Sequence, residues 1–194
     1  MSNAVSDTLL LGAAYDDTIT NSGDNVIFTV GKSSLTVNNG KGKKLALIDS
    51  AGKTSTTTIS DVFTVSNSTK SPVTVPAYVK TIDASKRTSA VRITGNDLAN
   101  TITGGTGNDS LYGGKGNDSL WDGDGKDVIS GFENDDLLKI TGTFSAPTYN
   151  KSDKSIAFKV GSGSVTLRDF GSTTTFHVNK SIYQLSSKGR FSVK

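Results

Sequence analysis

The sequence of 194 residues contains no cysteine and only one histidine, His177. Without cysteine the chain has no disulfide bridges and no thiolate metal site. One histidine excludes a metal site with several histidine ligands in one chain, and the zinc-protease signature H-E-x-x-H is absent. The G-x-S-x-G elbow of serine hydrolases is absent too. A secreted protein of this composition therefore needs another source of stabilisation, and bound metal is the first candidate.

Long hydrophobic runs are also missing. Hydrophobic residues make up 34% of the chain, and no run approaches the roughly 18 residues that a membrane helix needs. The segment Met1–Asp7 has neither a basic region nor a long apolar region, so we expect no cleavable N-terminal signal peptide. Gly, Ser, Thr and Asn are abundant instead, which favours many short strands joined by tight turns and predicts little helix.

Charge is distributed unevenly along the chain. The formal net charge is +3, but the segment 95–141 holds nine acidic residues against Lys115, Lys126 and Lys139. Its net charge is therefore −6, and that of the remainder is +9. The basic residues outside this segment are mostly scattered lysines rather than a patch, so we expect no nucleic-acid partner.

The acidic segment is built from five consecutive nonapeptides: GNDLANTIT, GGTGNDSLY, GGKGNDSLW, DGDGKDVIS and GFENDDLLK. Position eight is always aliphatic (Ile102, Leu111, Leu120, Ile129 and Leu138). Position six holds Asn100, Asp109, Asp118, Asp127 and Asp136. Glycines at positions one, two and four permit a tight turn, and the last three residues form a short strand whose middle side chain points inward.

Stacking such units creates rows of carbonyl and carboxylate oxygens along the turns. These oxygens repel one another unless a cation lies between them. A hard divalent cation fits an all-oxygen cage, and calcium tolerates irregular geometry better than magnesium does. The pattern therefore predicts calcium (Ca2+) sites in the turns.

The nonapeptides resemble the RTX (repeats-in-toxin, haemolysin-type) calcium-binding repeats. The resemblance implies an all-β chain with a parallel β-roll, a right-handed solenoid with two nonapeptides per turn, flanked by β-hairpin and β-sheet capping segments. It implies that calcium lies between same-side loops, held by loop carbonyls and position-six aspartates. Loop 104–109 is then expected to face loop 122–127, and loop 113–118 to face loops 95–100 and 131–136.

The resemblance also gives a set of candidate metal ligands. The main site is expected to pair Asp109 with Asp127, and two weaker sites are expected through Asp118, because Asn100 replaces an aspartate and the fifth loop is degenerate. Asp122 and Asp124 occupy positions one and three of the fourth repeat. The full expected set is Asn100, Gly104, Gly105, Gly107, Asp109, Gly113, Gly114, Gly116, Asp118, Asp122, Gly123, Asp124, Gly125, Asp127 and Asp136.

A second repeat has a much longer period. Residues 28–37 (FTVGKSSLTV) match residues 158–167 (FKVGSGSVTL) without a gap, and both alternate apolar and polar residues around a Gly-containing turn. This pattern predicts a β-hairpin in each copy. A degenerate nonapeptide at 12–20 precedes the first copy. We therefore divide the chain into an N-terminal β-rich segment (1–90), an RTX β-roll (91–139) and a C-terminal β cap with a secretion-signal region (140–194).

These observations favour a bacterial calcium-binding structural module rather than an enzyme. The resemblance implies a secreted or cell-surface protein that is exported unfolded by type I secretion machinery and folds on extracellular calcium. Two alternatives stay open: the calcium-binding tail of a secreted enzyme, or a calcium-dependent adhesin or polysaccharide-binding module with a cell-surface glycan or protein as its partner. Tyr112 and Trp121, at position nine, are expected to point outward, and His177 to lie on the solvent side of a strand.

Overall fold

The protein is all-β in the part of the chain that the computed structural model describes. The described residues are 7–10, 19–22, 25–30, 33–37, 44–48, 54–58, 61–76 and 79–194. They contain 21 strands and no helix, and none of them forms a helix able to cross a membrane. The chain divides into two compact units, with strands β1–β6 in the first and β7–β21 in the second.

The described strands of the first unit form two three-stranded sheets, in the orders β1-β5-β6 and β2-β3-β4. Strand β5 runs parallel to β1 and antiparallel to β6, whereas β3 is antiparallel to both of its neighbours. The strands are β1 (Asp7–Leu10), β2 (Ile19–Ser22), β3 (Asn25–Val30), β4 (Ser33–Val37), β5 (Lys44–Ile48) and β6 (Thr54–Thr58).

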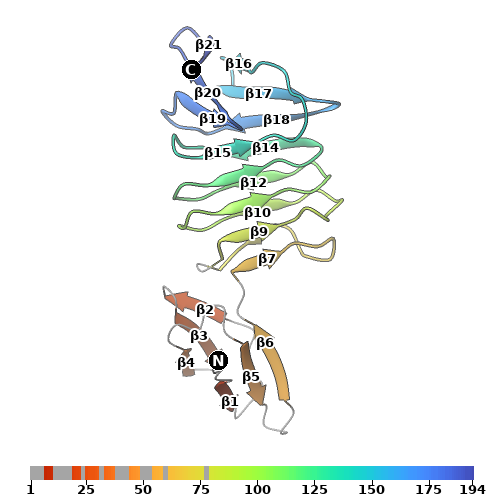
Figure 1. The fold of residues 1–194 in the computed structure, drawn as a ribbon, viewed down its shortest axis with the longest axis vertical. Helices are drawn as coiled ribbons and strands as arrows, with labels where there is room; N and C mark the ends of the chain where they lie inside the picture. Colours follow the sequence, from red (N-terminus) through yellow and green to blue (C-terminus); the bar gives the residue numbers. More distant parts are fainter. Residues whose placement is uncertain are drawn as a thin grey trace, which may run out of the picture. The chain divides into compact units, whose positions relative to one another are not determined.

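The second unit is a parallel β-roll in which successive strands alternate between two sheets (Figure 1). One sheet has the order β19-β15-β13-β11-β9-β7 and the other the order β18-β14-β12-β10-β8, all with parallel pairing. The strands are β7 (Val62–Thr64), β8 (Val73–Thr74), β9 (Thr81–Asp83), β10 (Arg92–Thr94), β11 (Thr101–Thr103), β12 (Ser110–Tyr112), β13 (Ser119–Trp121), β14 (Lys126–Ser130), β15 (Leu137–Lys139), β18 (Gly163–Arg168) and β19 (Thr175–Val178).

The nonapeptide period sets the register of the roll. Leu111 lies opposite Ile93 and Ile129, and Leu120 lies opposite Ile102 and Leu138, so that two nonapeptides make one turn. All five position-eight side chains are buried, as the repeat predicts. Burial of each contributes about 1.5–3 kcal/mol. The core is thus a double row of aliphatic side chains, one row from each sheet.

The C-terminal end of the roll is covered by antiparallel strands. Strands β16 (Thr148–Asn150) and β17 (Ser155–Val160) extend the sheet beyond β18, and β20 (Ser181–Leu185) and β21 (Phe191–Val193) extend the other sheet beyond β19. The interior here is aromatic: the rings of Phe170 and Phe132 pack on Phe176 with centroids 5.2 and 6.1 Å away. Aromatic packing replaces the narrow aliphatic core where the roll ends.

Both copies of the long repeat form the predicted hairpin. Phe28 lies opposite Leu35 in β3 and β4, and Phe158 lies opposite Val165 in β17 and β18. The degenerate nonapeptide at 12–20 falls mostly outside the described residues. The parallel stack of the roll continues on both sides of the nonapeptides, from β7 to β19. The division at residues 90 and 139 stays a prediction about folding units.

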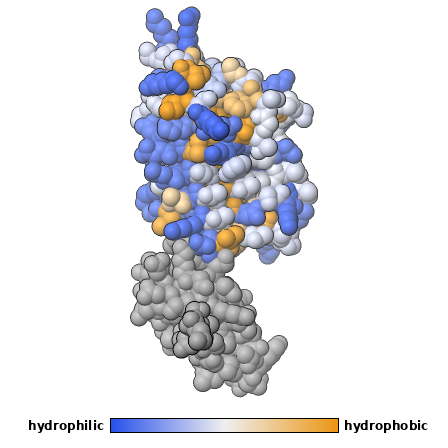
Figure 2. Space-filling model, viewed as in Figure 1, coloured by the Kyte–Doolittle hydropathy of each residue, from blue (hydrophilic) through white to orange (hydrophobic). Residues whose placement is uncertain are grey.

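Most of the visible face of the roll unit is hydrophilic, with hydrophobic residues in smaller groups between the polar ones (Figure 2). Tyr112 and Trp121 are 43% and 40% exposed, as expected for position nine. Tyr112 is in β12 and Trp121 is in β13, and these strands belong to different sheets of the roll. The two rings therefore do not share one binding platform.

Candidate metal centre in the loop stacks

The loops on one side of the roll contact each other in the expected order. Asp124 N donates to Gly105 O at 2.9 Å, and Lys126 N donates to Asn108 Oδ1 at 2.9 Å. Loop 122–127 therefore lies against loop 104–109. On the other side, Asn100 N donates to Asp118 Oδ1 at 2.7 Å, and Asp118 N to Asp136 Oδ1 at 2.9 Å. Loop 113–118 thus lies between loops 95–100 and 131–136.

Position-six carboxylates connect successive turns through their Oδ1 atoms. Asp127 Oδ1 accepts from Asp109 N at 2.8 Å, and Asp109 Oδ1 accepts from Val91 N at 3.0 Å, each across 18 residues. Each carboxylate thereby caps the backbone of the turn before it. A hydrogen bond to a charged group contributes about 1.5–3 kcal/mol, so these caps help to fix the spacing of the loops.

The other carboxylate oxygens of the loops, including those of Asp122 at position one, fall into two groups. Asp109 Oδ2 accepts from Gly105 N, and Asp136 Oδ2 accepts from Glu133 N, both at 2.8 Å. Three others are buried without a hydrogen-bond donor among the described residues: Asp118 Oδ2, Asp122 Oδ1 and Asp127 Oδ2. The three side chains are only 1% exposed. A buried, unpaired carboxylate oxygen is costly, and a metal ion is one group that satisfies it.

Glycines make room for these oxygens. A Cβ atom on Gly113 would collide with Asp118 Oδ2, so a side chain there would block the unpaired oxygen. Gly125 has φ of 127° and lies against Gly107 O, where only glycine gives both the conformation and the close approach. At Gly104, a Cβ atom would meet both Asp122 O of the neighbouring loop and Asp109 Oδ2, so glycine lets a loop carbonyl and a carboxylate lie close together.

The electrostatics of the site favour a cation. Burial is the main cause that raises the pKa of Asp118 and of Asp127 to about 7, and neighbouring carboxylates add to it. Burial likewise raises the pKa of Asp122 to about 6. The pKa values of Asp109 and Asp136 are also raised, mainly by burial. A divalent cation among these groups would reverse that penalty.

Side chains alone do not complete a coordination shell. Within the described ranges, no three His, Asp or Glu side chains converge as a metal-binding group. Calcium takes six to eight oxygen ligands and accepts backbone carbonyls among them. The aspartates can therefore supply only part of the shell, and the loop carbonyls are the protein oxygens available to extend it.

The expected ligands differ in how deeply they are placed. Asp122 is buried in the loop stack, whereas Asp124 is exposed and contacts the facing loop through its backbone N–H. Asn100 is buried, and its Nδ2 donates to Val79 O at 2.9 Å. The Asn100 amide thus donates to the Val79 carbonyl oxygen. An aspartate at this position could not donate, and this oxygen would be free to bind a cation.

Arg87, which the sequence analysis did not identify, lies in the loop between β9 and β10. This loop lies against loop 104–109, because Thr106 N donates to Arg87 O at 2.9 Å. Arg87 is 4% exposed, and its guanidinium donates to four carbonyl oxygens, those of Ser66, Thr69, Ser89 and Ala90. Ser66 and Thr69 follow β7, and Ser89 and Ala90 follow β9, so the group bridges two loops on one side of the roll. A side-chain cation here satisfies the loop carbonyls. No motif pointed to this role, because Arg87 precedes the nonapeptides.

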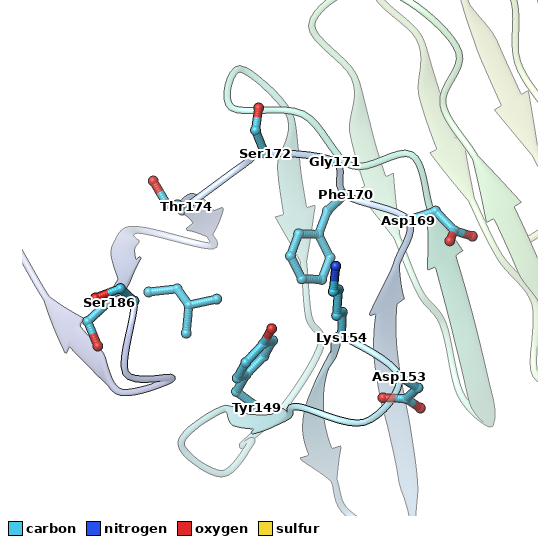
Figure 3. A pocket seen from close by; sticks show the side chains of 11 residues that line it. Tyr149, Asp153, Lys154, Asp169, Phe170, Gly171, Ser172, Thr174 and Ser186 are labelled. Carbon is cyan, nitrogen blue, oxygen red and sulfur yellow. The ribbon is translucent and has the colours of Figure 1, made fainter.

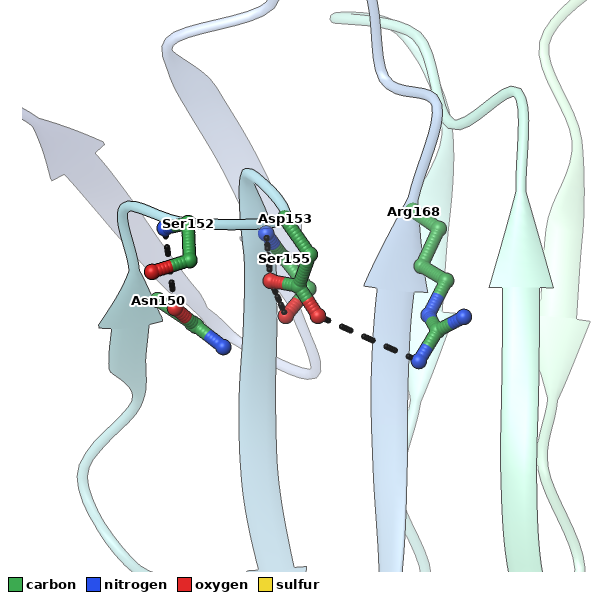
Figure 4. A network of polar contacts seen from close by, with 5 residues as sticks. All are labelled: Asn150, Ser152, Asp153, Ser155 and Arg168. Carbon is green, nitrogen blue, oxygen red and sulfur yellow. Dashed lines mark hydrogen bonds and ion pairs between the residues drawn. The ribbon is translucent and has the colours of Figure 1, made fainter.

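A surface groove of about 600 Å³ lies in the C-terminal cap. Tyr149, Lys154 and Phe170 are among the residues that line it (Figure 3). Its carboxylate Asp153 accepts from Ser155 N and Oγ at 3.1 and 2.7 Å and lies 4.0 Å from Arg168 (Figure 4). The Ser155 hydrogen bonds lower the pKa of Asp153. Asp153 therefore shapes the turn before β17.

The nonapeptides match a known family of repeats. The family model of the RTX calcium-binding nonapeptide repeat matches four copies at residues 94–129 and 115–138. A comparison with curated proteins gave no match. The crystal structure of the extracellular lipase LipA from Serratia marcescens is similar at 15% sequence identity and a TM-score of 0.42. The match covers 86% of this chain and 31% of the lipase, so the chain spans less than a third of that protein's length.

The fold and the repeats define a calcium-binding repeat module of the β-roll type. Residues 94–138 are RTX calcium-binding nonapeptide repeats.

Proposed function

We propose that this chain is a secreted or cell-surface bacterial structural module whose roll folds when extracellular calcium fills the loop stacks. The observation that carries the proposal is a set of three buried carboxylate oxygens, on Asp118, Asp122 and Asp127, that accept no hydrogen bond from any described residue. With calcium present these oxygens become ligands, and with calcium absent they remain a desolvated charge.

Asp127 Oδ2 and Asp122 Oδ1 belong to loop 122–127, and Asp118 Oδ2 belongs to loop 113–118. The proposal therefore places calcium on both sides of the roll. Carbonyls of the facing loops complete each shell. The fourth repeat contributes two buried carboxylates rather than one, which makes loop 122–127 the strongest site.

Coupling of folding to calcium follows from the same arrangement. Glycine-rich turns lose much conformational entropy on ordering, and the segment 95–141 carries a net charge of −6. Without calcium, the narrow aliphatic core has to offset both the entropy loss of the turns and the repulsion between the acidic residues. Binding free energy becomes folding free energy in such a module. Low cytosolic calcium then keeps the repeats unfolded for export by type I secretion machinery, and extracellular calcium folds them.

The proposal is tested by titrating the full chain with calcium, using calorimetry for binding and far-UV circular dichroism for folding. We expect strand signal to increase together with calcium binding, and magnesium at equal concentration to do much less, because it requires a tighter octahedral shell. Equal effects of the two ions would indicate charge screening instead of specific sites. Binding without any change in dichroism would contradict coupled folding.

A further inference from the structure

The six strands of the first unit repeat the strand order of the C-terminal end of the roll. The sheet β2-β3-β4 corresponds to β16-β17-β18, and β1-β5-β6 corresponds to β15-β19-β20. Strand directions agree as well: β1 and β5 are parallel like β15 and β19, and every other pair is antiparallel in both copies. The similarity thus extends far beyond the hairpin that the sequence repeat predicts.

The residue register agrees too. Phe28 lies opposite Leu35, as Phe158 lies opposite Val165. In the second sheet, Leu10 lies opposite Ile48, as Leu138 lies opposite Val178. Strands β1–β6 therefore form a second copy of the structure that caps the roll.

Two differences separate the two copies. The smaller one is that β20 pairs with β21, whereas β6 ends its sheet among the described strands. The larger one concerns the roll. In the C-terminal copy, β15 pairs in parallel with β13, and β18 pairs in parallel with β14, so the cap continues the roll. In the first unit, β1 and β4 each end their sheet among the described strands. An unpaired strand edge presents a row of N–H and C=O groups that another strand can pair with. The edges of β1 and β4 that are open among the described strands correspond to the edges that carry the roll in the other copy.

We propose that the edges of β1 and β4 form a docking site for the last coil of a second RTX β-roll, which the first unit terminates. The correspondence between the two copies defines what the partner must present. It needs two strands that follow each other in one coil and run parallel to β1 and β4, as β13 and β14 do to β15 and β18. The partner's last coil must have free strand edges at the C-terminal end of its roll, where a further coil would be added. The roll of this chain does not offer one, because β15 and β18 occupy β13 and β14. The partner is therefore another RTX roll segment.

A chimera tests this docking site in the full chain. A copy of residues 62–136, which span β7–β14, is placed so that its Asp136 directly precedes Leu9. This junction keeps the register, because Leu9 lies opposite Leu47 as Leu137 lies opposite His177. We expect the chimera to bind twice as much calcium as the native chain, since each stacked repeat array contributes its own sites. The backbone amides of β1 and β4 should then exchange more slowly.

The matched control is Leu9→Pro in the same chimera. Leu137 N donates to Asp118 O at 2.7 Å across the edge of the native roll, and proline at the corresponding Leu9 removes that donor. We expect this variant to lose the additional calcium while the native roll keeps its own. Calcium binding equal to that of the native chain would overturn the inference, and so would additional binding that survives Leu9→Pro.

The inference relies on the proposed function for its calcium readout, and the two fail differently. If the native roll binds no calcium, the proposed function is wrong, and amide exchange in β1 and β4 alone decides the docking site. Slower exchange in the chimera supports docking, and unchanged exchange overturns it.

Discussion

Replacing Asp127 by asparagine should change the stability of the roll in opposite directions with and without calcium. The side chain is 1% exposed; its Oδ1 accepts from Asp109 N at 2.8 Å, and its Oδ2 has no donor in the part of the chain that the structure describes. Asp127→Asn keeps an acceptor for that bond and removes the buried charge. Without calcium the variant should be at least as stable as the native chain, because burial raises the pKa of Asp127 to about 7 and so penalises the ionised form at neutral pH.

With calcium the same substitution removes a charged ligand. A tenfold loss of affinity lowers the stabilisation by saturating calcium by about 1.4 kcal/mol per site. Asp127→Ala also removes the bond to Asp109 N, which costs about a further 1.5–3 kcal/mol in both conditions. Comparing the two variants therefore separates the metal ligand from the cap.

The assay follows the fluorescence of Trp121, the only tryptophan, through urea unfolding in excess calcium and through osmolyte-induced folding in chelator, because the calcium-free roll is expected to be unfolded in buffer alone. Trp121 reports on the roll because it is in β13 and its ring lies 5.8 Å from Lys139 Nζ on the neighbouring strand. The control is Asp97→Asn, which removes an exposed carboxylate paired with Lys115 and should change stability by less than about 1 kcal/mol. Equal destabilisation by Asp127→Asn in both conditions would refute the reasoning.

Three further predictions follow from the loop stacks. The pKa of Asp118 and of Asp127 is raised to about 7, above the unfolded value of about 3.9, so the calcium-free roll should lose stability as pH rises from about 4 to about 7. Calcium affinity should increase over the same range. Osmolyte midpoints without calcium and calcium titrations, both at several pH values, check the two slopes. Arg87→Met should destabilise the first coils of the calcium-bound roll, because it leaves four loop carbonyls without their donor. Amide exchange over 62–92 in excess calcium measures this, and protection equal to that of the native chain would contradict it. Asp118→Ala should weaken calcium binding more than Asn100→Ala in calorimetry, because the Asn100 amide already donates to Val79 O; the reverse order would mean that the ligand pairing is wrong.

The nonapeptides predicted the centre of the molecule in residue detail. Strands β11, β12, β13 and β15 fall on positions seven to nine of their repeats, and the position-eight side chains form the core. The period was informative because each residue type at each position has one physical role. The aliphatic residue is buried, the aspartate caps a turn, and glycine permits close approach of the loops.

Other features lay beyond local pattern. Strands β18 and β19 join the roll across a long insertion that contains β16 and β17, so their parallel pairing has no short-range signal. Asp122 and Asp124 are alike in sequence, and only the stacking of loops shows that the first is buried and the second exposed. Arg87 is separated by about 20 positions from the Ser66 and Thr69 carbonyls that it binds, with no repeat to connect them.

The most direct test of the account is a crystal structure of the chain grown with calcium, with the ions located by their anomalous scattering. The account predicts ions about 2.3–2.6 Å from Asp127 Oδ2 and from Asp118 Oδ2, with carbonyl oxygens of the facing loops completing each shell. Ions found only at exposed carboxylates such as Asp97, with Asp118 and Asp127 still unpaired, would contradict it.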